Sequence, residues 1–384
     1  MLRRGSDARF TAPPEVHHTL QSLHALVSMA AKMARPGGDF VMSDYSTLDK
    51  LLHRVVLGSP ALSEMLGDMD GAAAGKSVAP ARAPVYVTGL ARAGTTVLMR
   101  ALHGSDQFAS LTYADMPMVM APNLWAKLSR SSRKEGEARE RAHGDGVMVD
   151  FDAPEALEEV FWRTHCGRDY IRPDGLVPHV PDAETLEAYR TYQARICHRY
   201  SRPRYLAKNN NMMLRLLPLA RALPEARFLI PVRDPLAQAQ SLRSQHARFQ
   251  DSDAFTRSYM TWLVHHEFGA DQRPFLLPGQ TAPEGPLDGL DYWLTEWIAC
   301  YGYLADMIDT ARAEGLEALL PVIYERLGSD PAAWPKVAAF AGVDPSADPG
   351  FRPATPPESD PQADTDLVAR ARALYDRLVA QADL

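Results

Sequence analysis

The chain has 384 residues, of which 46% are hydrophobic and 23% are charged, and its formal net charge is −7. This composition is typical of a globular protein with one large core, and the negative charge argues against a general affinity for nucleic acid or acidic membranes. No run of about 18 apolar residues occurs, so we expect no membrane span. The cysteines Cys166, Cys197 and Cys300 are scattered, which favours reduced thiols in a cytoplasmic protein over a disulfide framework or a zinc site.

Helical periodicity begins well before the main domain. Apolar residues recur at helical spacing over 15–35 and again over 43–67. Residues 71–84 are small and rich in proline and glycine, which indicates a linker. We therefore predict a helical N-terminal region at 1–80 and one α/β domain at 81–384.

The main domain alternates short apolar runs with helical patterns. Strands are predicted at 85–88 and 205–208 and within 226–235 and 319–327, ending at Thr88, Lys208, Arg233 and Tyr324. Helices are predicted at 95–103, 154–165, 183–200, 212–223, 290–313 and 331–343, after Pro235 and at the C-terminus. Loops or solvated faces are predicted at 129–143 and 272–288. This alternation predicts a P-loop-like α/β fold, in which helices flank a parallel sheet and ligands bind beyond the carboxyl ends of its strands.

The segment VTGLARAGTTVL follows the first predicted strand. Gly89 and Gly94 have the spacing of a P-loop, G-x-x-x-x-G-K-S/T, and Thr96 occupies its final position. Thr95 replaces the lysine that contacts the β- and γ-phosphates, and Arg92 lies inside the loop. Glycines that expose successive N–H groups before a helix form an anion cradle. We therefore predict an anion site that does not hold a nucleoside triphosphate with magnesium.

A second anion element is predicted at RDPLAQAQS. Arg233 ends a predicted strand, and Ser241 lies about two helical turns further on. An arginine can hold a phosphate through two hydrogen bonds, and a serine hydroxyl can add a third. An Arg-Asp-Pro turn more often forms a structural ion pair. The prediction of a second anion element therefore depends on the loop that precedes it.

Together these segments resemble the sulfotransferases that use 3′-phosphoadenosine 5′-phosphosulfate (PAPS). In that family a loop of the type Lys/Arg-Ser/Thr-Gly-Thr-Thr binds the 5′-phosphosulfate. An arginine followed eight residues later by a serine binds the 3′-phosphate. Here both occur in that order, with LAKNNN between them and VIYERLGSDPAAWPKVAAFAGV after them. The resemblance covers about residues 84–345 and adds nothing on 1–80.

The resemblance implies roles for the matching residues. Arg92 stands where the family has its loop cation against the sulfuryl group, and Lys208 matches the strand-end lysine near the sulfuryl oxygens. Arg233 and Ser241 match the 3′-phosphate ligands, and Tyr324 matches the tyrosine at the adenine. The 5′-phosphate loop itself comprises Gly89, Ala93, Gly94, Thr95 and Thr96. No metal is expected, because a sulfuryl group carries less charge than a phosphoryl group.

The acceptor must lose a proton, so a general base is expected. Cytosolic small-molecule members of the family have a histidine two residues after the strand-end lysine, but Asn210 stands there, and an amide is no base. Other branches use a carboxylate.

The candidate carboxylates are Asp115, Glu155, Glu158 and Glu159. Each could instead lie on a solvated helix face. We favour Glu158 or Glu159, because the apolar residues that follow them could raise a carboxyl pKa. Asp115 is a close second, and His165 is a further candidate.

The chain departs from the family at its C-terminus. The glycine-rich cofactor motif R-K-G-x-x-G is absent, and Arg352 in GFRP is the candidate substitute.

The favoured function is a PAPS-dependent sulfotransferase that acts on a hydroxyl or amine of a small-molecule, lipid or glycan acceptor. One alternative is a P-loop kinase or NTPase, against which Thr95 argues. A second is a non-catalytic nucleotide-binding protein on the same fold. The sequence indicates neither the acceptor nor the oligomeric state.

Overall fold

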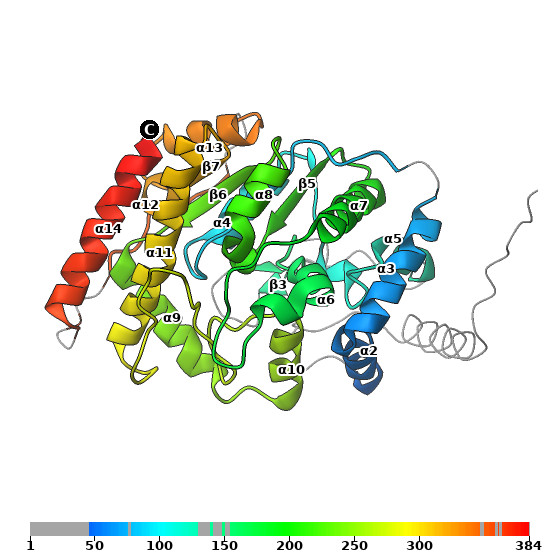
Figure 1. Ribbon diagram of the computed structural model, residues 1–384, viewed down its shortest axis with the longest axis horizontal. Helices are drawn as coiled ribbons and strands as arrows, with labels where there is room; N and C mark the ends of the chain where they lie inside the picture. Colours follow the sequence, from blue (N-terminus) through cyan, green and yellow to red (C-terminus); the bar gives the residue numbers. More distant parts are fainter. Residues whose placement is uncertain are drawn as a thin grey trace, which may run out of the picture.

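A computed structural model describes residues 46–75, 78–129, 139–140, 148–149, 154–345, 349–357, 360 and 363–383. Five parallel strands form its central sheet in the order β2-β5-β1-β6-β7 (Figure 1). They are β1 (Val85–Val87), β2 (Phe108–Ala109), β5 (Arg204–Lys208), β6 (Arg227–Val232) and β7 (Leu319–Ile323). The short strands β3 (Arg139–Glu140) and β4 (Met148–Val149) pair separately and antiparallel. The predicted α/β fold with a parallel sheet is confirmed.

Helices cover both faces of this sheet. The N-terminal ones are α2 (Thr47–Gly58), α3 (Pro60–Ala74), α4 (Thr95–His103), α5 (Pro122–Leu128), α6 (Glu159–Tyr170) and α7 (Ala183–Tyr200). The later ones are α8 (Leu216–Ala222), α9 (Pro235–Phe249), α10 (Ala254–Trp262), α11 (Leu290–Ala313), α12 (Tyr324–Leu327), α13 (Ala333–Ala341) and α14 (Thr365–Asp383). Two 3-10 turns, η2 (Tyr113–Asp115) and η3 (Asn210–Arg215), complete the described elements.

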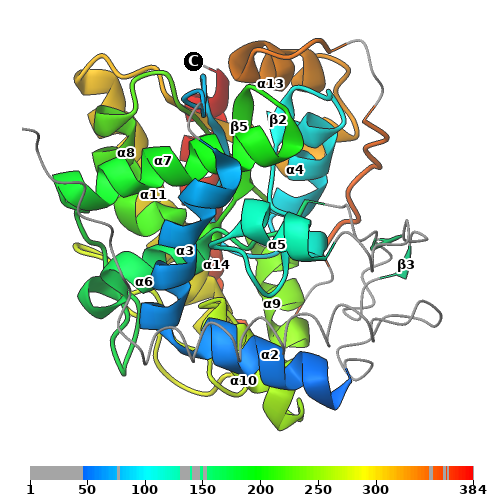
Figure 2. The same ribbon diagram turned by 90° about the vertical axis from the view of Figure 1, so that its right-hand side faces the viewer.

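Strand side chains alternate between two apolar layers, as the period of a β-strand requires. Tyr86, Tyr205 and Phe228 are fully buried against α6, α7, α8 and α11. Their neighbours Val85 and Leu229 point to the opposite face, where they pack with α4 and α13. Figure 2 shows the sheet between these groups of helices. The strands therefore lie in the core, and only their ends are open to ligands.

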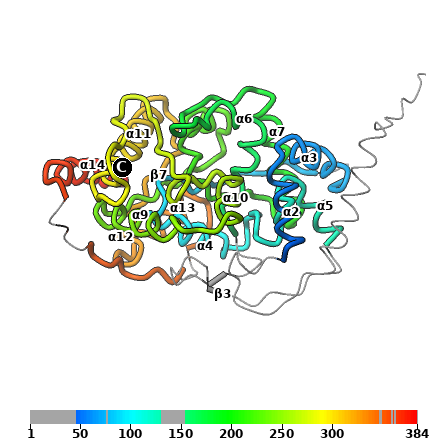
Figure 3. The backbone as a smooth tube through the Cα atoms, turned by 90° about the horizontal axis from the view of Figure 1, so that it is seen from below, coloured from blue at the N-terminus to red at the C-terminus, as the bar shows by residue number. Residues whose placement is uncertain are grey.

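The first and last described helices lie at opposite ends of the molecule. Helices α2 and α3 lie on one side, with α3 packed on α5, α6 and α7, while α14 lies beside α11 and β7 on the other (Figures 1 and 3). The predicted N-terminal helix at 15–35 falls outside the described residues, and so does most of the polar stretch 129–143. Among the helices that the structure describes, none is long and apolar enough to cross a membrane.

The predicted bounds of the helices at 95–103, 183–200 and 290–313 are confirmed by α4, α7 and α11. Helix α7 begins where the Asp182 carboxylate accepts a hydrogen bond from Thr185 N at 2.7 Å, a normal N-cap. The edge strand β2 was not predicted, because two residues are too short for a periodic pattern.

Several predicted bounds need correction. The linker predicted at 71–84 begins only after α3 ends at Ala74, and β1 and β6 end at Val87 and Val232, one residue before the predicted ends. The helix expected at 154–165 begins only at Glu159, because Pro154 forms an antiparallel bridge with Thr112 and Glu155 N donates to Leu111 O at 3.0 Å. The segment 212–223 is partly a 3-10 turn, η3, followed by α8. The strand within 319–327, predicted to end at Tyr324, ends at Ile323, and Tyr324 begins α12.

A buried carboxyl group lies in the long helix α11. Glu296 is 3% exposed, and its Oε1 accepts a hydrogen bond from Phe275 N at 3.0 Å. Burial raises its pKa from 4.5 to about 8, against the opposing effect of that hydrogen bond. The unfolded chain therefore loses a proton above about pH 4.5 that the native chain keeps until about pH 8. It follows that Glu296 lowers the free energy of unfolding as pH rises through this window.

We predict that Glu296→Gln flattens this pH dependence. Urea unfolding at pH 5 and pH 8 measures it, and the wild type should lose roughly 2–4 kcal/mol more than the variant between these values. The exposed Glu317 provides the control, because Glu317→Gln should keep the wild-type slope. Equal slopes for Glu296→Gln and wild type would contradict the prediction.

Candidate functional site

The loop between β1 and α4 contains three residues with positive φ angles. The angle is +143° at Gly89, +70° at Arg92 and +89° at Gly94. Gly94 directly precedes α4, and no side chain within the described ranges caps the N-terminus of this helix. The first-turn N–H groups of a helix have no partner within the helix, so this end is suited to an anion.

A buried amide holds the loop from behind. The Gln238 side chain, on α9, is fully buried, and its Nε2 donates to Leu90 O at 3.2 Å and to Ala91 O at 2.9 Å. Its Oε1 in turn accepts hydrogen bonds from Trp297 Nε1 at 3.0 Å and Tyr301 OH at 3.2 Å. Sequence reasoning missed this residue, because its partners lie about 60 and 150 positions away.

The two predicted anion elements lie in contact. Arg92 Nε donates to Ser241 Oγ at 3.0 Å, and Arg233 Nη1 donates to Arg92 O at 3.2 Å. The guanidinium of Arg233 lies over the ring of Tyr324, 5.4 Å from its centroid. Arg233 Nε is buried and has no hydrogen-bond partner among the residues that the structure describes. A buried donor without an acceptor is suited to an anionic ligand.

The strand-end lysine reaches the start of α4. Lys208 Nζ donates to Thr96 Oγ1 at 3.1 Å and lies 3.8 Å from Glu155 Oε1. Both charged side chains are mostly buried, at 11% and 10% exposure. Glu155 is thus the candidate carboxylate that the structure places beside a cation of the site.

Glu158 faces the core instead. Its side chain is 2% exposed, and Tyr189 OH and Tyr205 OH donate to Oε2 at 2.8 and 2.9 Å. Trp162 Nε1 and Asn209 Nδ2 donate to Oε1 at 3.0 and 3.1 Å. Burial raises the pKa of Glu158 although these hydrogen bonds oppose the shift. Its four donors make it the centre of a structural network.

Glu159 is likewise committed to other residues. Arg215 donates to it through two hydrogen bonds at 2.9 and 2.8 Å, and both side chains are buried. Asn209 Nδ2 also donates to Glu159, at 2.7 Å. Asn209 thus joins both acids to the end of β5, which explains an asparagine after Lys208.

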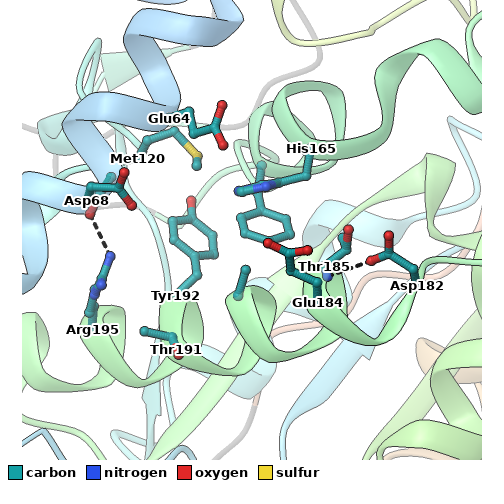
Figure 4. Close-up of a pocket in the computed structure, with 13 residues that line it drawn as sticks. Glu64, Asp68, Met120, His165, Asp182, Glu184, Thr185, Thr191, Tyr192 and Arg195 are labelled. Carbon is teal, nitrogen blue, oxygen red and sulfur yellow. Dashed lines mark hydrogen bonds between the residues drawn. The ribbon is translucent and has the colours of Figure 1, made fainter.

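The remaining base candidates lie in other surroundings. Asp115 is fully buried and accepts hydrogen bonds from Thr112 N at 2.9 Å and from Tyr200 OH, which closes the turn η2. His165 lies on α6, in a pocket of about 430 Å³ between α3, α6 and α7 (Figure 4). The ring of Phe161 lies 4.3 Å from the His165 ring centroid. Arg352, the candidate C-terminal substitute, is exposed.

Asn210 contacts an acid that sequence reasoning did not single out. Asn210 Nδ2 donates to Glu267 Oε1 at 2.7 Å, and His265 Nδ1 lies 3.7 Å from Glu267 Oε2. Burial would raise the pKa of Glu267, but the interactions with His265 and Asn210 lower it to about 2. Glu267 therefore stays ionised beside Asn210. The segment HHEF at 265–268 contains titratable residues, but nothing in the sequence indicates that it lies near the end of β5.

The close contact of Gly94 with Tyr324 leads to a prediction. A Cβ at position 94 would lie 2.4 Å from Tyr324 Cδ2, and φ of +89° disfavours any L side chain. Gly94→Ala should therefore lower the free energy of unfolding by roughly 1–3 kcal/mol in urea denaturation. Gly104→Ala, at the other end of α4, meets only ordinary contacts at 3.5 Å and should change it by less than about 1 kcal/mol. An equal loss in both variants would contradict the prediction.

Comparisons with known proteins identify a family for most of the main domain. The family model described as "Sulfotransferase family" matches residues 84–281. The chain is 16% identical to a sulfotransferase from Alicyclobacillus acidocaldarius, over 79% of this chain and 95% of the other, with a TM-score of 0.38. It is 14% identical to sulfotransferase STF9 from Mycobacterium avium, over 96% and 88%, with a TM-score of 0.40. No curated protein matches the chain.

Proposed function

We propose a specific reaction for this chain, which belongs to the sulfotransferase family by the match over residues 84–281. It transfers a sulfuryl group from PAPS to a hydroxyl or amine of an acceptor. The contact of Arg92 with Ser241 carries the proposal. It joins two anion-binding elements that are about 150 residues apart in the chain, which a donor with two separate phosphate groups requires.

The proposed donor site uses the described contacts. Gly94, Thr95 and Thr96 hold the 5′-phosphate through N–H groups and hydroxyls at the start of α4. Arg233 and Ser241 hold the 3′-phosphate. Arg233 Nε, which has no partner in the described part of the chain, supports this assignment.

Tyr324 is assigned to the adenine, because its ring lies against both Gly94 and Arg233. Gly89 and Ala93 complete the loop. PAPS, when bound, supplies the sulfuryl group.

Two cations stabilise the charge that develops during transfer. Lys208, held at Thr96, and Arg92, held at Ser241, both lie at the carboxyl edge of the sheet. Fixed cations at such a position stabilise charge on the transferred oxygens and on the leaving phosphate without reorganisation. We include no metal in this reaction.

We assign the general base to Glu155 rather than to Glu158, Glu159 or Asp115. The carboxylate of Glu155 lies 3.8 Å from Lys208 Nζ, on the side of the proposed transfer. It can accept the acceptor's proton there. The three buried acids hold internal contacts instead. The acceptor class and a cytoplasmic location remain parts of the proposal; the three free, buried cysteines support the latter.

We predict that the arginines control binding of the product, 3′-phosphoadenosine 5′-phosphate (PAP). Arg233→Ala and Arg92→Ala should each weaken PAP binding by roughly 10–100-fold in calorimetry, because each removes a charged hydrogen-bond donor. Arg190→Ala, which removes an exposed ion pair with Glu187, should bind as wild type does. A folded wild-type chain that binds magnesium-ATP and not PAP would favour the kinase alternative.

Glu155→Gln should separate catalysis from binding. We expect the rate of labelled sulfate transfer from PAPS to an acceptor pool to fall by about 10²–10⁴, with the Kd for PAP unchanged. Glu158→Gln is the comparison, and it should lower stability more than the rate per folded molecule. The assignment fails if Glu155→Gln keeps the wild-type rate. Binding without any turnover in wild type would favour the non-catalytic alternative.

A further inference from the structure

The C-terminal helix α14 reaches the two segments that carry Arg233 and Tyr324. Arg372 Nη2 donates to Asp234 Oδ2 at 2.8 Å, and Tyr375 OH donates to Glu325 Oε2 at 2.9 Å. Asp234 N donates to Glu325 Oε1 at 2.8 Å, and this hydrogen bond links the two pairs. We call Asp234, Glu325, Arg372 and Tyr375 the C-terminal clamp. Figures 1 and 3 show α14 along the side of α11.

The clamp fixes backbone on both sides of the proposed 3′-phosphate site. Asp234 follows Arg233 directly, and its carboxylate also caps α9 through Ala237 N at 3.1 Å. Glu325 follows Tyr324, at the start of α12. Because the Asp234–Glu325 hydrogen bond joins these two turns, the direction in which Arg233 leaves the sheet depends on it.

The clamp also controls the local charge. Asp234 and Glu325 bring two carboxylates together beside a site that we assign to an anion. The Asp234 side chain is 12% exposed, so water screens its charge weakly. Arg372 neutralises Asp234. Burial, and next the Glu325 carboxylate, raise the pKa of Tyr375, so its hydroxyl keeps the proton that it donates to Glu325.

We propose that the C-terminal clamp makes this chain specific for nucleotides that carry a 3′-phosphate, with Arg372 and Tyr375 as positioning residues. The inference rests on the proposed function, because it assumes that Arg233 binds that phosphate. Without Arg372, the Asp234 carboxylate opposes the 3′-phosphate and pairs with Arg233 in its place. Groups at the 5′-phosphate loop lie outside the clamp and should keep their affinity.

The test compares two nucleotides that differ by the 3′-phosphate. Calorimetry on the full chain gives the Kd for PAP and for adenosine 5′-phosphate (AMP). Arg372→Ala should weaken PAP binding by about tenfold or more and change AMP binding by less than about threefold. Tyr375→Phe, which keeps the ring, should show the same direction with a smaller effect.

A matched control lies about one and a half helical turns further along α14. Arg377 pairs with Asp306 and Asp309 on α11, at 2.8 and 2.6 Å, away from the clamp. Arg377→Ala should leave both affinities unchanged. In the double variant D234N/R372A, asparagine still caps α9 and the unpaired charge is gone, so PAP binding should recover in part.

An equal loss of PAP and AMP binding in Arg372→Ala would overturn the clamp. The same loss of PAP binding in Arg377→Ala would also overturn it. Urea unfolding of each variant shows whether it is folded at the assay temperature. A folded wild type that does not bind PAP would instead overturn the proposed function, and the clamp with it. If the wild type binds PAP and Arg372→Ala binds it equally well, the clamp alone is overturned.

Discussion

The proposed anion loop depends on the side-chain amide of Gln238. Its two N–H groups hold the carbonyls of Leu90 and Ala91, and its oxygen is held by Trp297 and Tyr301. Those two carbonyl oxygens are therefore directed at a buried partner and not at a ligand. An anion site built from backbone needs this orientation, since a carbonyl aimed at the ligand would repel it.

Helix α9 positions further parts of the proposed site besides the loop. It begins at the Asp234 cap, carries Gln238 one turn later and carries Ser241 on the following turn. One rigid element thus positions the back of the loop, the partner of Arg92 and the turn of Arg233. Buried acids support the other side, where Asn209 links Glu158 and Glu159 to the end of β5. Cations and neutral donors therefore meet at one edge of the sheet although the chain is acidic overall.

The sequence predicted the elements that local pattern determines. The loop glycines, α4, α7 and α11 follow from spacing, caps and apolar period, and the ordered motifs indicated the family. The choice of general base did not follow from the sequence in this way, because Glu158 or Glu159 was favoured there and we propose Glu155. A helix that began at Pro154 would include all of residues 155 to 159. The bridge between Pro154 and Thr112 instead holds Glu155 outside the helix. Contacts of this kind, like those of Gln238, join residues far apart in the chain and leave no periodic trace.

The long helix α11 limits how this protein can evolve. The family match ends at residue 281, yet Trp297 and Tyr301, which hold the loop amide, lie beyond it on α11. The conspicuous motifs are therefore not a portable module. A gene fusion or deletion that kept residues 84–281 would retain every recognisable letter of the loop and lose the two donors that orient it. The motif and a working site could thus be inherited separately, because part of the support of the loop lies after residue 281.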